Sequence, residues 1–151
     1  YLSFKTRQIG KPVRFVELAQ EINNSMPAYV VGQVSEILNK NGKILNNSKI
    51  LLMGVAYKKD ISDMRESPAI DITELLLEKK VDVSYFDPFV EKFTVYGNEI
   101  NKEDQMNSFN SYDMLLVLTP HSNFSDIDFS KINTIVFDTT GSDFIQSTER
   151  L

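Results

Sequence analysis

Residues 49–88 read KILLMGVAYKKDISDMRESPAIDITELLLEKKVDVSYFDP, and this stretch decides the fold that the sequence predicts. It begins with a continuous apolar run at 49–56, which is typical of a strand buried on both faces of a parallel sheet. Ser67 followed by Pro68 is an N-cap with proline at the first helical position, and apolar residues then continue a helix to about Lys80. The pattern therefore predicts a strand followed by a helix, with a long charged connection between them.

The rest of the chain continues the same alternation. Residues 81–88 alternate between apolar and polar and then stop at Asp87-Pro88, because a central strand cannot continue through proline. We expect two more strands within 112–120 and 133–141, a small hairpin around Gly97-Asn98 and a short helix near 122–126. Strands that alternate with helices predict an α/β fold, a doubly wound parallel sheet of Rossmann-like type.

A long helix is predicted to precede this domain. From Pro12 to about Asn39, apolar residues recur at three- and four-residue intervals, and Pro27 should kink the helix. A helix of this length extends roughly 40 Å, more than a small domain needs. We therefore expect part of its apolar stripe, including Val30 and Val34, to pack against another subunit or domain. The alternative, a helix wholly covered within this chain, stays open.

Composition limits the classes of protein. The 151 residues are 42% hydrophobic and 25% charged, which is typical of one ordinary globular domain. Sixteen basic and 21 acidic side chains give a net charge of -5, so no overall field favours nucleic acid or an anionic bilayer. No apolar run could span a membrane and no signal peptide is seen, so we expect a cytoplasmic protein.

The numbers of cysteine and histidine residues argue against disulfides, most metal sites and some kinds of catalysis. The absence of cysteine rules out disulfides, Cys-ligated zinc and a thiol nucleophile within these residues. A single histidine, His121, leaves little for a His-rich metal site or a catalytic triad, so no metal is expected. Because the chain starts at Tyr1 rather than Met, we expect it to be part of a longer protein.

The charged connection at 57–66 is the candidate functional segment. Ligands of open α/β sheets bind outside the carboxyl ends of the strands, where this segment lies. The following helix N-terminus favours phosphate, and Lys58, Lys59 and Arg65 add full charges. Gly54 stands alone rather than in a Gly-rich phosphate motif, so side chains must hold a diphosphate. Arg65 is the best suited, because its planar fork matches phosphate or carboxylate oxygens.

Two alternatives compete with a diphosphate site. Asp60, Asp63 and Glu66 could neutralise the three cations in a solvated loop, and the residues alone favour neither interpretation. A receiver-type signalling domain shares the architecture, but it needs an acidic pocket at the strand ends. The cations at this place argue against a receiver.

A family resemblance rests on three motifs in this order: Gly-x-x-x-Lys-Lys from Gly54, Asp-x-Arg-Glu-Ser-Pro from Asp63, and Asp87-Pro88. They resemble the C-terminal domain of the UDP-glucose/GDP-mannose dehydrogenase family. Residues 14–31 resemble the central dimer-forming helix, especially of members that oxidise UDP-N-acetylhexosamines, and residues 1–10 resemble the segment after the catalytic loop. The resemblance implies three parts: 1–10 as the tail of that loop, 11–47 as the helix and a linker, and 48–151 as the UDP-sugar-binding domain.

The resemblance also implies an oxidoreductase activity for the parent enzyme. Members oxidise C6 of a UDP-sugar to a carboxylate in two NAD-dependent steps, through a cysteine-bound intermediate, for polysaccharide synthesis. For this chain it implies UDP-N-acetylglucosamine or its mannosamine epimer as the sugar, and a homodimer through the 12–39 helix. NAD would be bound mainly by a domain absent from these residues. Without that domain and the cysteine, the chain should bind a UDP-sugar without turning it over.

Carried over by motif, Tyr57 and Lys58 match positions that contact the nucleotide-sugar, and Arg65 matches the arginine that contacts NAD on the other domain. One departure is Asp138-Thr139-Thr140, where the family usually has Asp-x-Arg. Thr140 cannot supply a charge-assisted contact to the sugar, so the sequence does not specify which UDP-sugar is bound.

Four further residues have a structural and a functional interpretation. For His121 we favour a structural role at the start of the short helix over catalysis. For Asp87 we favour an Asp-Pro turn over acceptance from a ribose hydroxyl. Asn24 and Met26 match the family loosely, at positions near the parent's active site.

Overall fold

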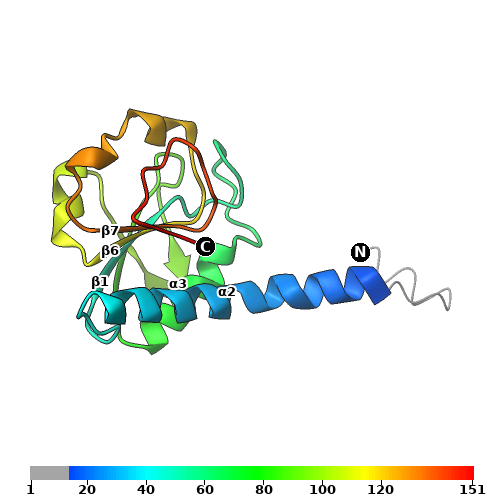
Figure 1. Cartoon of the computed structure of the whole chain (residues 1–151). Coiled ribbons are helices and arrows are strands. Elements are labelled where there is room, and N and C mark those ends of the chain that lie inside the picture. The colour runs from blue at the N-terminus through cyan, green and yellow to red at the C-terminus, as the bar shows by residue number, and fades with distance from the viewer. Residues whose placement is uncertain (1–13) are drawn as a thin grey trace.

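A computed structural model describes residues 14–151 (Figure 1), so the prediction for 1–10 lies outside the described residues. Its main feature is a six-stranded sheet in the order β5-β2-β1-β6-β7-β8, and every neighbouring pair is parallel. The strands are β1 (Lys49–Met53), β2 (Asp82–Phe86), β5 (Asn101–Lys102), β6 (Met114–Val117), β7 (Ile135–Asp138) and β8 (Glu149–Arg150). The predicted parallel α/β fold is confirmed.

The central strands end level with one another. In the register of the sheet, Met53 lies beside Phe86 of β2 on one side and beside Val117 of β6 on the other. The backbones that follow these three strands therefore emerge at the same edge of the sheet, called here the carboxyl edge. This edge is where the charged connection begins.

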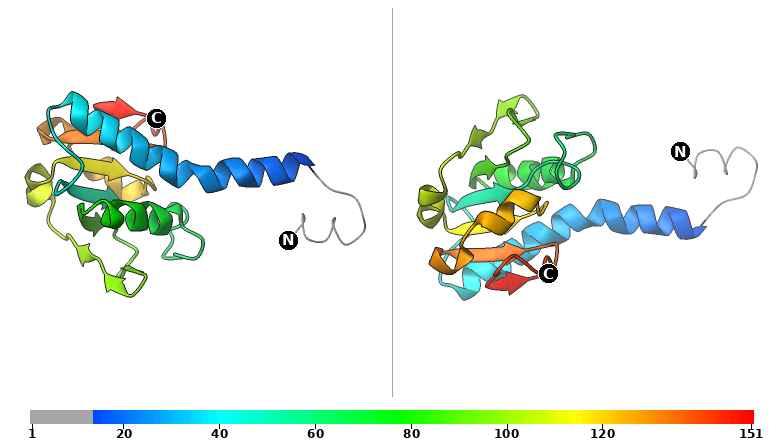
Figure 2. Two further views of the ribbon diagram at one scale, coloured as in Figure 1. Left: turned by 90° about the horizontal axis from the view of Figure 1, so that it is seen from below. Right: turned by 90° about the horizontal axis from the view of Figure 1, so that it is seen from above.

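Two α-helices cover one face of the sheet (Figure 2), namely α2 (Arg14–Lys40) and α3 (Pro68–Glu78). The Ser67 hydroxyl accepts from the Ala69 amide, so the predicted N-cap is confirmed. Side chains of β1 alternate between the faces, with Ile50 and Leu52 in the core beneath the α-helices.

The opposite face is covered by single turns and loops instead of long helices. Three 3-10 helices lie there: η1 (Met106–Ser111), η2 (Ser122–Asp126) and η3 (Phe129–Lys131). Each contributes one buried phenylalanine to a second core, which contains Leu51 and Met53 of β1. The short helix predicted near 122–126 is therefore present as a 3-10 helix.

The predicted hairpin is also present beside α3. It consists of β3 (Thr94–Val95) and β4 (Asn98–Glu99), which pair antiparallel. Its turn residues are Tyr96 and Gly97, both with positive φ (47° and 83°), as the tight turns of two-residue hairpins require. The turn thus lies one residue earlier than predicted.

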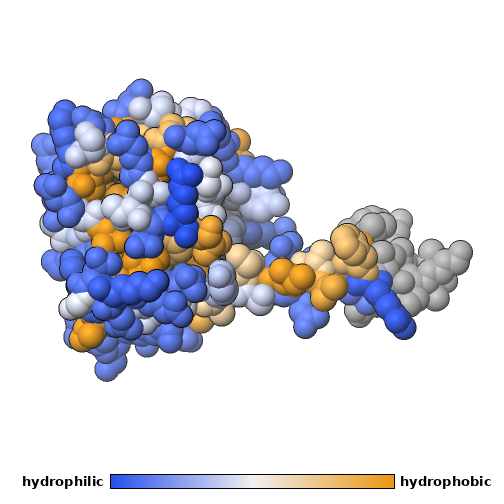
Figure 3. All heavy atoms as spheres, in the orientation of Figure 1, coloured by the Kyte–Doolittle hydropathy of each residue, from blue (hydrophilic) through white to orange (hydrophobic). Residues whose placement is uncertain are grey.

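α2 has two halves with different surroundings. Its second half packs on α3 and the sheet, where Val30, Val34 and Leu38 are almost completely buried. Its first half projects away from the domain, and apolar side chains are visible along it (Figure 3). The exposed large apolar residues of α2 are Phe15, Leu18, Ile22 and Tyr29.

Two expectations for α2 are corrected by this arrangement. The helix is not wholly covered within the described chain, and Val30 and Val34 belong to this chain's own core rather than to a free surface. Pro27 lies in the middle of the helix without ending it, and the two views of Figure 2 show the axis bending about midway. Neither α2 nor any other helix in 14–151 is long and apolar enough to cross a membrane.

Candidate functional site

Gly54 determines how the chain leaves β1 at the carboxyl edge. Its φ is +76°, and a Cβ at this position would lie 2.0 Å from the carbonyl oxygen of Thr119, which follows β6. Only glycine allows this close approach of two backbones. The charged connection at 57–66 therefore starts against the segment that follows β6, so the two loops are neighbours.

Tyr57 and Lys58 lie side by side at the start of the connection. The Tyr57 amide donates to the Asp63 carbonyl at 2.7 Å, which folds the connection into a loop. The Tyr57 side chain is partly exposed, and the Lys58 ammonium lies 5.3 Å from the centroid of its ring. Lys59 lies similarly over Phe144, at 5.4 Å. Both lysines thus rest on aromatic rings, and neither forms an ion pair within 14–151.

Arg65 has a different partner. Its guanidinium donates to both carboxylate oxygens of Asp63, at 3.0 and 2.8 Å, while its side chain stays 89% exposed. These hydrogen bonds lower the pKa of Asp63 to about 2. Neutralisation by a neighbouring acid, one of the two interpretations of the loop, therefore applies to Arg65. Lys59 interacts with the charge of Asp60 without forming an ion pair, and Lys58 forms no ion pair within 14–151.

The loop is open rather than enclosed. The structure has a hollow of about 490 Å³ lined by residues of the segment 143–150, and one of about 200 Å³ between α3 and the β3–β4 hairpin. Tyr57, Lys58 and Arg65 line neither of them. Neither hollow is therefore the predicted diphosphate site, and most residues of the loop are exposed.

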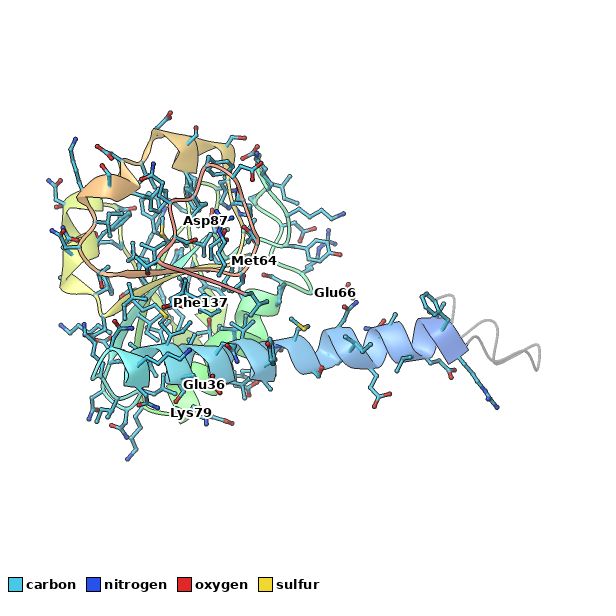
Figure 4. The ribbon with its side chains drawn as sticks, in the orientation of Figure 1. Glu36, Met64, Glu66, Lys79, Asp87 and Phe137 are labelled. Carbon is cyan, nitrogen blue, oxygen red and sulfur yellow. The ribbon has the colours of Figure 1, made fainter. Side chains whose placement is uncertain are left out.

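Asp87 occupies the interior of the domain, as Figure 4 shows, and is only 1% exposed. Its carboxylate accepts hydrogen bonds from the amides of Val55, Ala56, Phe89 and Val90, at 2.7 to 3.2 Å. Burial alone would raise its pKa, but the His121 and amide hydrogen bonds outweigh burial and lower it. Since protein donors occupy both oxygens, the ribose interpretation is wrong and the turn at Asp87-Pro88 is confirmed.

His121 is the candidate residue whose side-chain contacts were least evident from the sequence. Its imidazole is fully buried, with Nε2 3.0 Å from the Asp87 carboxylate and Nδ1 accepting from the Asp60 amide at 2.9 Å. His121 does precede η2, but its side chain makes no capping hydrogen bond. The predicted position at the helix start is confirmed, because His121 is the N-cap residue of η2 and its carbonyl accepts from the Phe124 amide at 3.0 Å. Its side chain in addition bridges two loops, which was not predicted. Asp87 and His121 each follow a strand that was predicted from the sequence, and this was the signal available there. The structure shows that these two strands, β2 and β6, flank β1.

The other candidate residues lie apart from the loop in sequence. Thr140 donates through its hydroxyl and its amide to Asp138, at 2.7 and 2.9 Å, and closes a turn after β7. Asn24 accepts from Gln20, one turn earlier on α2, and Met26 is partly buried on the same helix. In 14–151 no group of three or more His, Asp or Glu side chains is arranged to hold a metal ion.

The chain is similar to several curated dehydrogenases. It is 36% identical over 134 residues to the UDP-N-acetyl-D-mannosamine dehydrogenase of Methanococcus maripaludis, covering 83% of this chain and 30% of that protein. It is 26% identical over 145 residues to the UDP-N-acetyl-D-glucosamine 6-dehydrogenase of Pseudomonas aeruginosa, covering 89% and 32%. The chain thus spans about a third of the length of these relatives.

Solved structures agree in fold and in sequence. The UDP-N-acetyl-mannosamine dehydrogenase of Staphylococcus aureus superimposes with a TM-score of 0.69 and 32% identity, over 91% of this chain and 32% of that one. The UDP-D-ManNAc dehydrogenase of Pyrococcus horikoshii gives 0.70 and 26%, over 87% and 30%. The model of the UDP-glucose/GDP-mannose dehydrogenase family, UDP binding domain, matches residues 51–143. The chain therefore belongs to the UDP-glucose/GDP-mannose dehydrogenase family, and most of it corresponds to the family's UDP-binding domain.

Proposed function

We propose that this chain is the nucleotide-sugar-binding portion of a cytoplasmic, NAD-dependent UDP-sugar 6-dehydrogenase. The whole enzyme would oxidise the C6 alcohol of UDP-N-acetylglucosamine or its mannosamine epimer to a carboxylate, for polysaccharide synthesis. The observation that carries the proposal is the Tyr57–Lys58 pair at the carboxyl edge, in a domain that matches the family's UDP-binding domain. Ligands of parallel α/β sheets bind at this edge.

The pair has the chemistry that a nucleotide-sugar needs. The Lys58 ammonium forms no ion pair within 14–151, so its charge is available to a diphosphate. The Tyr57 ring offers an apolar surface to a base or sugar ring, and its hydroxyl is a hydrogen-bonding group. In the proposed complex the ligand covers an open loop, and residues outside this chain complete the enclosure.

Arg65 is proposed to contact NAD. Asp63 engages two of the five N–H donors of a guanidinium, so the other donors are free to bind a phosphate on a neighbouring domain. NAD would accept the hydride in the oxidation. Because these 151 residues contain no cysteine, oxidation through a thiolate is not expected of the chain by itself.

Calorimetric titration of UDP and of each UDP-sugar into the 151-residue chain tests the proposal. The matched control for Lys58→Ala is Lys79→Ala, which removes the same charge at the far end of α3 (Figure 4). We expect the control to bind like the wild type and Lys58→Ala to bind about tenfold more weakly, as for a lost charge-assisted hydrogen bond. No heat at millimolar ligand, or equal binding by all three proteins, would contradict the proposal.

A second function, dimerisation, is favoured by the projecting half of α2. Its exposed residues Leu18 and Ile22 lie four apart, on one face of the helix, and Phe15 extends the same stripe. A contiguous apolar stripe of this kind marks an interaction surface. We propose that it pairs with a second copy of the chain, so binding and dimerisation would coexist in the parent enzyme.

A further inference from the structure

The imidazole of His121 joins two loops at the carboxyl edge. Because the Asp60 amide donates to Nδ1, this nitrogen carries no hydrogen, and the neutral ring has its proton on Nε2. Nε2 then donates to the Asp87 carboxylate at 3.0 Å. One side of the ring is thus fixed to the buried core, and the other side holds the backbone of the charged loop.

Asp60 is the residue of the loop that His121 holds. Its φ is +61°, in the left-handed region that costs energy for residues other than glycine. Its carboxylate accepts from the amide and the hydroxyl of Ser122, at 2.7 and 2.6 Å. Three hydrogen bonds to residues 121 and 122 therefore fix an otherwise unfavourable backbone conformation.

Other attachments of the loop are few and lie on either side of Asp60. Lys59 lies over the Phe144 ring, and Met64 packs partly against the core. Figure 4 shows Asp87 within the domain and Glu66 at its margin. Asp60 comes two residues after Lys58, so a change in its φ would redirect the backbone that carries the proposed ligand contacts.

We propose that His121 is a positioning residue, which holds the 57–66 loop in its binding conformation through the Asp60 amide. The proposal rests on the proposed function only in naming UDP as the ligand. His121 itself is fully buried, so it would act without touching the ligand. Its effect on binding is transmitted through Asp60 to Tyr57 and Lys58.

Two conservative substitutions separate the two hydrogen bonds of the ring. In His121→Asn the side-chain oxygen is placed like Nδ1 and keeps an acceptor for the Asp60 amide. In His121→Gln the longer side chain places its amide nitrogen like Nε2 and keeps the donor to Asp87, but it loses the acceptor. Each variant leaves one hydrogen-bonding group without its His121 partner, so both are expected to unfold at lower urea concentrations than the wild type.

The test combines UDP titration with amide hydrogen exchange measured by NMR. We expect His121→Asn to bind UDP within about threefold of the wild type and His121→Gln to bind at least tenfold more weakly. Equal affinity in all three proteins would overturn the proposal. An equal loss in both variants would overturn it too, because a purely structural role predicts that result.

Hydrogen exchange at the Asp60 amide tests the positioning role of His121 in the absence of UDP. Protection in the wild type and in His121→Asn, with fast exchange in His121→Gln, would support the positioning role even if the wild type bound no UDP. In that case the proposed UDP binding would be wrong, while the positioning role of His121 would stand. Equal protection in both variants would overturn the positioning role, whatever the titration shows.

Discussion

Arg65 donates two hydrogen bonds from one guanidinium to both carboxylate oxygens of Asp63, two residues earlier in the chain. The Arg65 amide donates to the same carboxylate at 3.0 Å, so backbone and side chain bind one acceptor. The pair holds an almost fully exposed guanidinium in a defined orientation. A local acid therefore orients the cation without removing it from solvent.

The Asp63–Arg65 pair predicts an acidic titration. The hydrogen bonds of Arg65 lower the pKa of Asp63 to about 2. A lowered pKa in the folded state means that the pair stabilises the loop above the unfolded pKa of about 4, and that this stabilisation is lost as the pH falls through about 2. Carboxyl carbon shifts measured by NMR should show this midpoint, and Arg65→Ala should return it towards 4. An unchanged midpoint in the variant would contradict the pairing.

Asp87 is predicted to be the carboxylate whose substitution costs most. In Asp87→Asn an amide group replaces an acceptor that faces buried N–H donors, so the free energy of unfolding should fall by about 2–4 kcal/mol. Asp126→Asn, at an exposed position of η2, is the control and should change it by less than about 0.5 kcal/mol. Urea denaturation at pH 7 measures both.

The cost of Asp87→Asn should also depend on pH. The folded-state pKa of Asp87 is lowered, so its stabilising effect is present above the unfolded value of about 4 and is lost as the pH falls through the folded value. The difference in unfolding free energy between the wild type and Asp87→Asn should therefore shrink in acid. A constant difference from pH 7 to pH 3 would argue against a carboxylate that is ionised in the fold.

Gly54 and Gly42 form a matched pair for a test of the close approach. Both have positive φ, at +76° and +70°, but only Gly54 would place a Cβ against another backbone. Gly42→Ala should lower the unfolding free energy by about 1–2 kcal/mol from conformation alone. Gly54→Ala adds the contact with Thr119 and should cost roughly 3 kcal/mol or more. If thermal or urea unfolding shows the same loss of unfolding free energy for Gly42→Ala and Gly54→Ala, the backbone at Thr119 moves to accept the added Cβ at little cost.

Dimerisation through α2 is tested by sedimentation over a range of concentrations. Leu18→Glu together with Ile22→Glu should convert a dimer to a monomer, because charges then replace the apolar stripe. Gln20→Glu adds a charge on the opposite face of the helix and should leave the dimer intact. A wild-type chain that is monomeric at every concentration would exclude this role.

Elements with strong local signals could be predicted from the sequence. Ser67-Pro68 marks the start of α3, and the apolar run at 49–53 marks β1, because capping chemistry and burial on both faces leave direct patterns. The 3-10 helices on the second face have weaker signals. They are short, and single phenylalanines rather than a periodic stripe cover the sheet there.

The site was only partly predictable, because its polar contacts join distant segments. Lys58 and Arg65 stand out as charges, but the sequence does not show that Arg65 pairs with Asp63 while Lys58 lies over Tyr57. The bond between His121 and Asp60 joins residues 61 apart in sequence. Such contacts follow from the strand order, so they became visible only with the sheet assembled.

The shared core of α2 and the sheet has a consequence for anyone who trims this protein. Val31, Ile37 and Leu38 leave with the helix if the chain is cut anywhere between 41 and 47, and the part of the core that α2 covers becomes exposed, although α3 remains. Such a product should aggregate instead of serving as an autonomous nucleotide receptor. Because α2 is one continuous helix from Arg14 to Lys40, its buried second half also connects the projecting half directly to the core of the domain.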